Sequence, residues 1–539
     1  MPFCKILKNR KRSRLRSILR GYLILKRKKY DKIADIKRLL ADQDLKIGHK
    51  NFSHLIIGKN IDKSLYEVCI KQYLLLRIGS HSLDSALLST ISQTGKKLVY
   101  PMPNEWRLSI EEHGFLVSHW RSECLWRFYL LGLVGYSFFK MLKIIIKSIL
   151  GTFVATDQLD KYVYFSNLSN LNIPKKPNLK MSYDIISWYI KTRGDKYNIS
   201  LIKHDAKDSS PVKLNNVCIK KSNSGPIPYL VGWKNICIFF LWGVSATFLS
   251  LWDLIRGRWW HAFILNQSIL SKQIMLTHPT RLAKEYLFHN SSQTYRPLWT
   301  YDAEKFGAKI TLYFYSTNIE GFKSNNSYSS ATYAWRCMTW PRYLVWDQMQ
   351  ADFVRRVSGP KVVIETVGTI WFSDSSETLI PDSKDKIAVF GVTPHRVARS
   401  CLYGNAASYY SPDNCIAFLE HVFNVSEKIN YNCFFKMKRD PGTLVEKKYK
   451  NFVEEQSKKS RIIILNPEIA AYHVIKASSI VISMPFTATA LIAKELGKPS
   501  IYYDPKGQIQ KDDRAAHGIP IITGKEELEE WFSTIKKLK

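Results

Sequence analysis

The stretch SSIVISMPFTATALIAKELGKPSIYYDP, residues 478–505, decides the fold. Its opening apolar run ends at Ser483 and has the length and composition of a buried strand. An Ala- and Leu-rich helical segment follows, with Pro485 in its opening turn and Gly497 as its natural C-cap. A second apolar run begins at Ser500. The stretch therefore predicts a strand, a helix and a second strand of an α/β domain.

Working outward, six short apolar runs in the second half of the chain are separated by helical segments, which is typical of a parallel sheet. These predicted strands are IAVFGVT (387–393), CFFKMKR (433–439), RIIIL (461–465), SIVIS (479–483), SIYYD (500–504) and PIIT (520–523). Upstream, residues 161–167, 285–290 and 309–318 are predicted strands, with a helix between the last two that starts near Pro297 and ends at Gly307. We therefore predict an α/β protein with two Rossmann-like domains facing a cleft at the carboxyl ends of their strands.

Three regions follow from this pattern. Residues 1–156 are a basic, helix-rich extension, residues 157–380 a first Rossmann-like domain, and residues 381–539 a second Rossmann-like domain. The polar segment SSETLIPDSKDK, residues 375–386, is the predicted linker between the two α/β domains.

The formal net charge of +35 points to an anionic partner, and much of it lies near the start of the chain. Arg10, Lys11, Arg12, Arg14, Arg16 and Arg20 are followed by Lys26, Arg27, Lys28 and Lys29. We expect this arm to bind an anionic membrane surface, each near-surface cation contributing about 1 kcal/mol, and nucleic acid is the less favoured partner. A basic helix that is merely solvated is the alternative.

Two apolar segments bear on the membrane. The segment 126–156 carries lysines at helical spacing and resembles a helix lying in the membrane interface. The segment 236–252 falls slightly short of the roughly 20 residues that a span requires, so a buried helix of a soluble domain is equally compatible with it. Because the basic start is not followed by a secretory signal pattern, we expect a cytoplasmic protein, peripheral on the inner face of the cytoplasmic membrane.

The predicted helix after Ser483 carries three hydroxyl groups near its N-terminus, on Ser483, Thr487 and Thr489. The N-terminus of a helix attracts phosphate through free N–H groups and the helix dipole, so these residues are candidates for binding a donor phosphate. Capping of the helix alone would use one hydroxyl rather than three.

Two other loops should reach the same edge of the sheet. One carries Thr393, His395 and Arg396, and the other Lys436, Lys438 and Arg439. Such cations can neutralise the phosphate of a departing nucleotide, although any single one could equally be a solvated strand end.

At these residues the sequence resembles the bacterial polysaccharide-biosynthesis family named for its PFTS motif. The likeness is carried by VFGVTPHR, FFKMKRDPG, VISMPFTATALIAKELGKPSIYYDP and AAHGIP, with YRPLWTYDAEKFG and LYFYSTN upstream. It implies a glycosyltransferase of the two-domain GT-B type, with residues 157–380 as its acceptor domain and residues 381–539 as its nucleotide-sugar donor domain. One residue departs from the motif, because Ala488 stands where the family name has serine.

The implied reaction moves a sugar from a nucleotide-activated donor to a polysaccharide or lipid-linked glycan acceptor and needs one general base. His289, Glu320, Asp347 and Asp374 are unranked candidates for that base, because each lies near a predicted strand end or loop. We expect no cofactor and no metal: the only Asp-x-Asp pair, Asp42 and Asp44, lies in the basic extension, and no cysteines form a C-x-x-C pair.

Alternatives remain open at this point. A nucleotide-sugar epimerase or a polyol-phosphate transferase would use the same fold. A non-enzymatic basic protein that binds membranes or nucleic acid would explain the N-terminal arm but not the phosphate-facing helix. Resemblance to the hydroxyl-rich loop of bacterial sialyltransferases gives a preference for a cytidine monophosphate donor, with uridine diphosphate sugars open.

Overall fold

The structure is a computed structural model. It describes the following residues: 13–24 except 15 and 22, 32–45 except 44, 54–57, 63–152, 161–174, 183–194, 198–207, 210–289, 295–317, 321–328 except 325 and 326, 333–370 except 337, 380, 386–394, 409–438, 442 and 445–537.

The larger sheet has the strand order β10-β9-β6-β5-β1-β2-β4-β3. All its pairings are parallel except that of β3 with β4 at one edge. Its strands are β1 (Tyr162–Phe165), β2 (Leu201–His204), β3 (Val212–Leu214), β4 (Val217–Lys221), β5 (Glu285–His289), β6 (Lys309–Tyr313), β9 (Arg342–Val345) and β10 (Val363–Thr366). The three strands predicted from this part of the sequence, now β1, β5 and β6, are confirmed.

The smaller sheet is entirely parallel and has the order β13-β12-β11-β14-β15-β16. Its strands are β11 (Lys386–Phe390), β12 (Asn432–Lys436), β13 (Ile462–Leu465), β14 (Ile480–Ser483), β15 (Ser500–Asp504) and β16 (Ile521–Thr523). All six predicted strands are confirmed. Because β11 has β12 on one side and β14 on the other, the strand order reverses here, which is where doubly wound sheets bind ligands.

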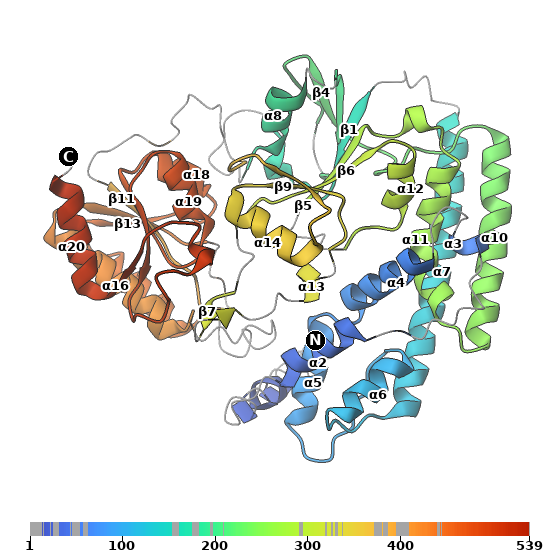
Figure 1. Ribbon diagram of the computed structural model, residues 1–539, viewed down its shortest axis with the longest axis horizontal. Helices are drawn as coiled ribbons and strands as arrows, with labels where there is room; N and C mark the ends of the chain where they lie inside the picture. Colours follow the sequence, from blue (N-terminus) through green and yellow to red (C-terminus); the bar gives the residue numbers. More distant parts are fainter. Residues whose placement is uncertain are drawn as a thin grey trace, which may run out of the picture.

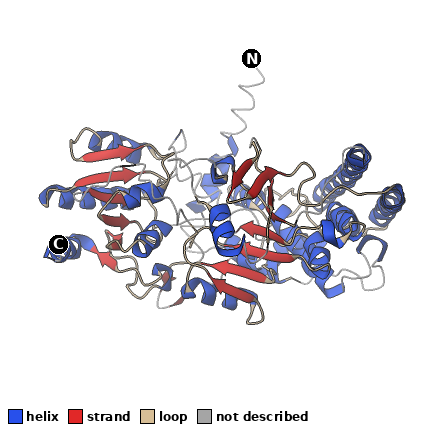
Figure 2. Ribbon diagram, turned by 90° about the horizontal axis from the view of Figure 1, so that it is seen from above, coloured by secondary structure: helices blue, strands red, loops and turns tan. Residues whose placement is uncertain are grey.

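Helices connect the strands of both sheets, and in Figure 2 they lie on both sides of the smaller sheet. They are α8 (Ile185–Tyr189), α12 (Trp299–Lys305), α13 (Tyr333–Arg336), α14 (Gln348–Ser358), α16 (Pro412–Lys428), α17 (Lys447–Gln456), α18 (Ala471–Lys476), α19 (Ala488–Glu495) and α20 (Gly524–Lys537). Helix α12 lies where Pro297 and Gly307 predicted a helix. The protein therefore has the two Rossmann-like domains of a GT-B-like fold, as predicted.

The helix after β14 starts later than predicted. Pro485 was expected in its opening turn, but α19 begins at Ala488 and Thr487 is its N-cap residue. Residues 484–487 instead form a turn between strand and helix. Tyr410 and Tyr502 hold this turn: Tyr410 Oη bonds to Pro485 O at 2.5 Å, and Tyr502 Oη donates to Thr487 O at 2.7 Å.

A helical layer covers the side of the larger sheet that lies away from the smaller sheet (Figure 1). Its long members are α7 (His119–Thr152), α10 (Trp233–Ile255) and α11 (Trp260–Met275), which all pack against one another. Smaller helices join them, namely α2 (Lys32–Asp42), α3 (His54–Ile57), α4 (Lys63–Arg77), α5 (His81–Ile91) and α6 (Asn104–Glu112). The predicted boundary at residue 156 thus follows α7 in sequence, while α7 packs with helices of the next region.

Within the described residues, α7 and α10 are two helices that are long and apolar enough to cross a membrane by length and composition. The relevant windows are 28% buried in α7 and 39% buried in α10. Most of the surface of each window therefore faces away from the protein interior.

The two α/β domains contact each other through segments that follow the carboxyl ends of their strands. Phe322, after β6, packs on Phe486, after β14, with ring centroids 5.4 Å apart. The short hairpin of β7 (Lys323–Ser324) and β8 (Ser327–Tyr328) lies between the domains in Figure 1, and Tyr328 Oη donates to Asp513 Oδ1 at 3.1 Å. The carboxyl edges of the two sheets thus lie next to each other.

Candidate functional site

Three strand ends align at the switch point of the smaller sheet. Phe390, the last residue of β11, pairs in register with Lys436 on β12 and with Ser483 on β14. Residues in register on neighbouring strands point to the same face, and strands lie about 4.8 Å apart, so Lys436 and Ser483 are separated by roughly 10 Å. A cation and a hydroxyl from two predicted loops therefore belong to one row of the sheet.

The hydroxyl groups of Ser483, Thr487 and Thr489 form a continuous hydrogen-bonded row. Ser483 Oγ lies 2.7 Å from Thr489 Oγ1, which lies 2.9 Å from Thr487 Oγ1. Thr487 occupies the N-cap position of α19, yet its side chain makes no capping hydrogen bond within the described part of the chain. The hydroxyls therefore face one another at the positive end of the helix rather than neutralise it.

The loop after β11 adds a third polar group. The hydroxyl of Thr393 is buried and has no hydrogen-bond partner among the described residues. A buried polar group without a hydrogen-bond partner lowers folding stability by about 1–3 kcal/mol. Such a group therefore indicates a place where a ligand or a water molecule supplies the missing hydrogen bond. Its neighbours His395 and Arg396 lie outside the described residues, as does Arg439 in the adjacent loop.

Lys436 is the most perturbed cation of this site. Its side chain is 7% exposed, and Nζ donates to Met437 O at 3.2 Å. Burial, and then the nearby positive charge of Lys438, lower the pKa of Lys436 to about 8. Lys438 lies beyond the end of β12 and is exposed. The structure thus separates the two lysines, which were expected to share a face, into one buried and one exposed cation.

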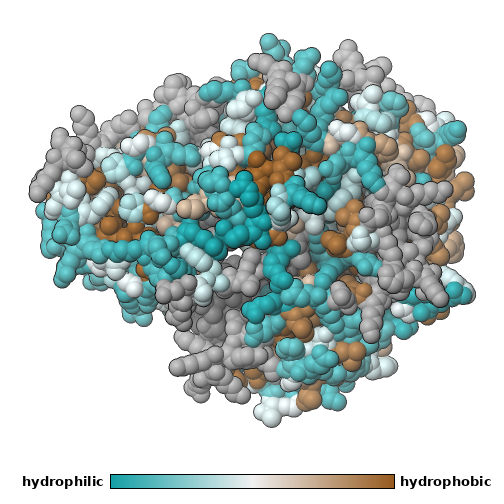
Figure 3. Space-filling view, viewed as in Figure 1, coloured by the Kyte–Doolittle hydropathy of each residue, from teal (hydrophilic) through white to brown (hydrophobic). Residues whose placement is uncertain are grey.

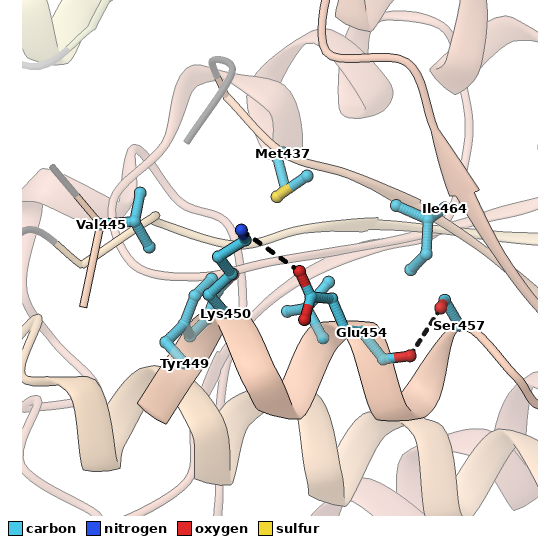
Figure 4. Close-up of a pocket in the computed structure, with 8 residues that line it drawn as sticks. Met437, Val445, Tyr449, Lys450, Glu454, Ser457 and Ile464 are labelled. Atoms are coloured by element: carbon cyan, nitrogen blue, oxygen red, sulfur yellow. Dashed lines mark hydrogen bonds and ion pairs between the residues drawn. The ribbon is translucent and has the colours of Figure 1, made fainter. Parts of the chain in front are cut away.

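A cavity of about 280 Å³ lies between α17 and the edge strand β13 (Figure 4). Its lining residues are Met437, Val445, Tyr449, Lys450, Val453, Glu454, Ser457 and Ile464. The one cation among them, Lys450, is ion-paired with Glu454 at 3.4 Å. The cavity is therefore suited to an apolar group rather than to a phosphate.

His289 lies at the carboxyl edge of the larger sheet, at the end of β5. It is 5% exposed, and its Nε2 bonds to the backbone oxygen of Asn167 at 2.9 Å. Since a carbonyl oxygen only accepts, Nε2 carries the proton and Nδ1 is the basic atom. Burial lowers the pKa of His289 below its usual value, so the ring is neutral near pH 7.

Asp205, which the sequence did not single out, lies next to His289 after β2. Its carboxylate accepts hydrogen bonds from the backbone N–H groups of Asn167 and Leu168, at 2.7 and 3.1 Å. Burial raises the pKa of Asp205, and the charge of this carboxylate acts on His289. An acid within the polar segment KHDAKD carries no signal of its own, because only the parallel pairing of β5, β1 and β2 brings it to His289.

The other candidates for a general base are placed differently. Asp347 follows β9, caps α14 by accepting from Gln350 N at 2.9 Å, and bonds to His517 of the donor domain. Glu320 and Asp374 lie outside the described residues. No group of three His, Cys, Asp or Glu side chains suited to a metal ion occurs among the residues that the structure describes.

Comparison with known proteins identifies the family. The sequence profile described as "Polysaccharide biosynthesis PFTS motif protein" matches residues 242–532, which is more than half of the chain. The chain belongs to this family. The match spans every strand from β5 to β16 and so includes both carboxyl edges of the site. A search of curated proteins found no match.

Solved structures similar to this PFTS-motif protein are remote. UDP-GlcNAc 2-epimerase from Methanocaldococcus jannaschii is 10% identical with a TM-score of 0.36, over 69% of this chain and 92% of that one. The wall teichoic acid polymerase TagF is 12% identical with a TM-score of 0.37, over 74% and 89%. A trehalose-phosphate synthase from Burkholderia vietnamiensis is 9% identical with a TM-score of 0.34, over 71% and 92%.

Proposed function

We propose that this protein is a glycosyltransferase that moves a sugar from a nucleotide-activated donor to a surface-polysaccharide acceptor. The observation that carries the proposal is the row Ser483–Thr489–Thr487 at the N-terminus of α19, in register with the buried Lys436. Hydroxyl donors, a helix N-terminus and a cation together suit the phosphate of a nucleotide. Membership of a polysaccharide-biosynthesis family supports a glycan as the acceptor.

In the proposed reaction, Nδ1 of His289 takes the proton of an acceptor hydroxyl while the oxygen forms a bond to the anomeric carbon of the donor sugar. The bond between that carbon and the phosphate oxygen breaks, and the electron pair leaves with the nucleotide. The hydroxyl row, the helix dipole and Lys436 stabilise the departing phosphate. Asp205 favours the imidazolium that His289 becomes. No step in this scheme requires a metal.

The donor nucleotide is proposed as cytidine monophosphate, on the strength of the hydroxyl-rich loop alone. We propose a cytoplasmic location at the inner face of the cytoplasmic membrane, where a polysaccharide or lipid-linked glycan acceptor would be met. Supporting this location, Arg14, Arg16 and Arg20 of the basic arm are exposed. Nucleic acid is the less favoured partner.

The test uses the full chain and two measurements. Calorimetric titration with CMP, CDP, UDP and GDP identifies the nucleotide, and incubation with the matching nucleotide sugars and a glycan acceptor identifies the products. Released nucleotide with a glycosylated acceptor supports the proposal. An isomerised donor would instead show an epimerase, transfer of a polyol phosphate would show a polyol-phosphate transferase, and salt-sensitive RNA binding without nucleotide binding would show a non-enzymatic protein.

A further inference from the structure

Helices α7 and α10 form an antiparallel pair, although about 80 residues separate them. Ser148, near the end of α7, accepts a hydrogen bond from Leu230 N just before α10, at 3.1 Å. At the other end, Trp126 of α7 packs on Trp259 just after α10, with ring centroids 5.6 Å apart. The two helices therefore present one joint outer surface, which the sequence could not show.

On α10 this outer surface is apolar over the whole helix. Ile238, Leu241, Phe248, Trp252 and Ile255 recur at helical spacing and are 37–73% exposed. Between Lys234 and Arg256 the one charged residue is Asp253, which is 3% exposed and hydrogen-bonded to His261. Soluble proteins rarely expose an uncharged apolar face along a helix of 23 residues, and such a face indicates an interaction surface.

Helix α7 continues the same surface. Its exposed apolar side chains include Phe128, Leu131, Phe139, Ile146 and Leu150, which are 46–72% exposed. In Figure 3 brown side chains gather along the margin that α10 occupies in Figure 1. This joint face, defined by the exposed apolar side chains of α7 and α10, is called here the hairpin face.

Cations and tryptophans border the hairpin face at both ends. One end has Lys147, Trp233 and Lys234, and the other has Trp120, Arg121 and Arg256, all of them exposed. Tryptophan and basic residues around an apolar surface match the layered chemistry of an anionic bilayer, with acyl chains inside and phosphates at the rim. A second copy of this chain would meet like charges at both rims, which is unfavourable.

The packing behind the hairpin face argues against a crossing of the bilayer. Helix α11 covers the inner side of α7 and α10 and packs in turn on α12 of the larger α/β domain. Lys140, midway along α7, donates to Asn266 on α11 at 2.6 Å, and Trp242 Nε1 of α10 donates to Leu55 O at 2.6 Å. If α10 crossed a membrane, the polar domain beside its midpoint would have to lie in hydrocarbon.

We propose that the hairpin face inserts in the plane of an anionic membrane, with α7 and α10 lying along the interface and both ends on the same side. The proposed membrane-binding surface thus includes α10, although the sequence of residues 236–252 was equally compatible with a buried helix of a soluble domain. The acceptor domain, attached through α11, is then held at a fixed height above the headgroups. This proposal does not depend on the chemistry of the donor site.

The first experiment measures co-sedimentation of the full chain with vesicles of 30% phosphatidylglycerol and 70% phosphatidylethanolamine. The double variant Leu241→Gln/Phe248→Gln should partition at least tenfold more weakly, since it removes two exposed apolar side chains from the face. The matched control Val363→Gln/Ile463→Gln, on exposed positions of the edge strands β10 and β13, should bind like the unmodified protein. Equal binding by both variants overturns the proposal, and thermal unfolding of each confirms that it is folded.

The second experiment distinguishes insertion in the plane from a span. Lys234→Cys and Arg256→Cys variants, bound to sealed vesicles from outside, are treated with a membrane-impermeant maleimide, and the labelled peptides are identified by mass spectrometry. Labelling of both positions is expected, with protection of Cys237 on the hairpin face and continued labelling of Cys218 on β4. Labelling of only one end would show a span and overturn the proposal, as would a stable dimer without vesicle binding.

Discussion

His517 Nδ1 lies 2.6 Å from Asp347 Oδ2, and this hydrogen bond joins the smaller α/β domain to the larger one. The His517 side chain is 2% exposed and that of Asp347 26% exposed. Although burial acts to raise it, the hydrogen bond and charge of His517 lower the pKa of Asp347 below its usual value. Asp347 was a candidate for the general base, yet its lowered pKa makes it a weak one and suits it to holding the domains together.

We expect this pair to show energetic coupling. In a double-mutant cycle of Asp347→Ala and His517→Ala, the coupling free energy of unfolding should be about 1.5–3 kcal/mol, the range for hydrogen bonds to charged groups. Asp347→Asn keeps an N-cap for α14 and should cost less than Asp347→Ala. Urea unfolding measures all four proteins, and additivity within about 0.5 kcal/mol would show that the pair contributes no coupling.

The pair of Asp347 and His517 should also make the stability of the protein depend on pH. The pKa of Asp347 is lower in the folded protein than its unfolded value of about 3.9. The charge of Asp347 therefore contributes fully to the free energy of unfolding above about pH 3.9, and this contribution is lost as the pH falls through the folded pKa. The difference in urea midpoint between the unmodified protein and Asp347→Asn should therefore shrink as the pH falls from 6 to 3. A difference that stays constant would assign the stabilisation to something other than the carboxylate charge.

Thr487→Val tests the phosphate site. The substitution removes one hydroxyl at nearly constant volume and should weaken nucleotide binding about tenfold or more, as expected for one hydrogen bond to a charged group. Since the Thr487 hydroxyl makes no cap in α19 and its bond to Thr489 Oγ1 joins two neutral hydroxyls, the melting temperature should fall only slightly. Thr534→Val on the exposed face of α20 is the matched control. A markedly lower melting temperature with unchanged nucleotide affinity would show that the Thr487 hydroxyl caps the helix and does not bind the nucleotide.

Because Lys436 is buried, we expect a rise in pH to weaken nucleotide binding while it increases folding stability. With a pKa of about 8, its positive charge is lost above that pH, so nucleotide affinity should fall as the pH rises from 7 to 9. The unfolded chain keeps the proton up to about 10.4, so the contribution of Lys436 to stability rises over the same range. Lys436→Met should bind nucleotide weakly and independently of pH. If the variant retains the pH dependence, another group is responsible.

His289→Gln tests the base. Transfer should fall by about 10²–10⁴-fold, the usual contribution of general base catalysis, while nucleotide affinity is unchanged. Since the pKa of His289 is lowered, kcat/KM should decline with acid only below about 6.5. Asp205→Asn should reduce kcat less than His289→Gln does, and His113→Gln at the C-cap of α6 serves as the control. Full activity of His289→Gln would remove it from the mechanism.

The sequence predicted the donor domain well because its parallel strands are buried on both faces and stand out as uninterrupted apolar runs. It missed β2, β4, β9 and β10, whose segments LIKH, VCIKK, RYLV and VIET are short or carry charges. The antiparallel β3 at the sheet edge was missed for the same reason. Short strands that carry charged residues are specified by pairing with their neighbours rather than by their own pattern.

For the site, local motifs located Ser483, Thr487, Thr489 and Lys436, because strand ends and helix starts are local features. The tyrosines that hold the 484–487 turn, Asp205 beside His289, and the His517–Asp347 bond were not found. Each depends on strand order or on contacts between domains, 170 residues apart for His517 and Asp347. Local sequence patterns do not indicate which of these distant residues come into contact in the folded protein.

The pairing of α7 with α10 has a consequence for the order of synthesis. Ser122, Ser137 and Ser148 of α7 are buried in the folded protein, and α7 packs on α10 and α11, which come later in the chain. Ser148 and Leu230 are 82 positions apart, and a ribosome needs roughly 4–16 s for that length at about 5–20 residues per second. During at least that interval the nascent α7 lacks the two helices that pack on its inner side, so apolar side chains on both sides of the helix are exposed to the surroundings of the ribosome.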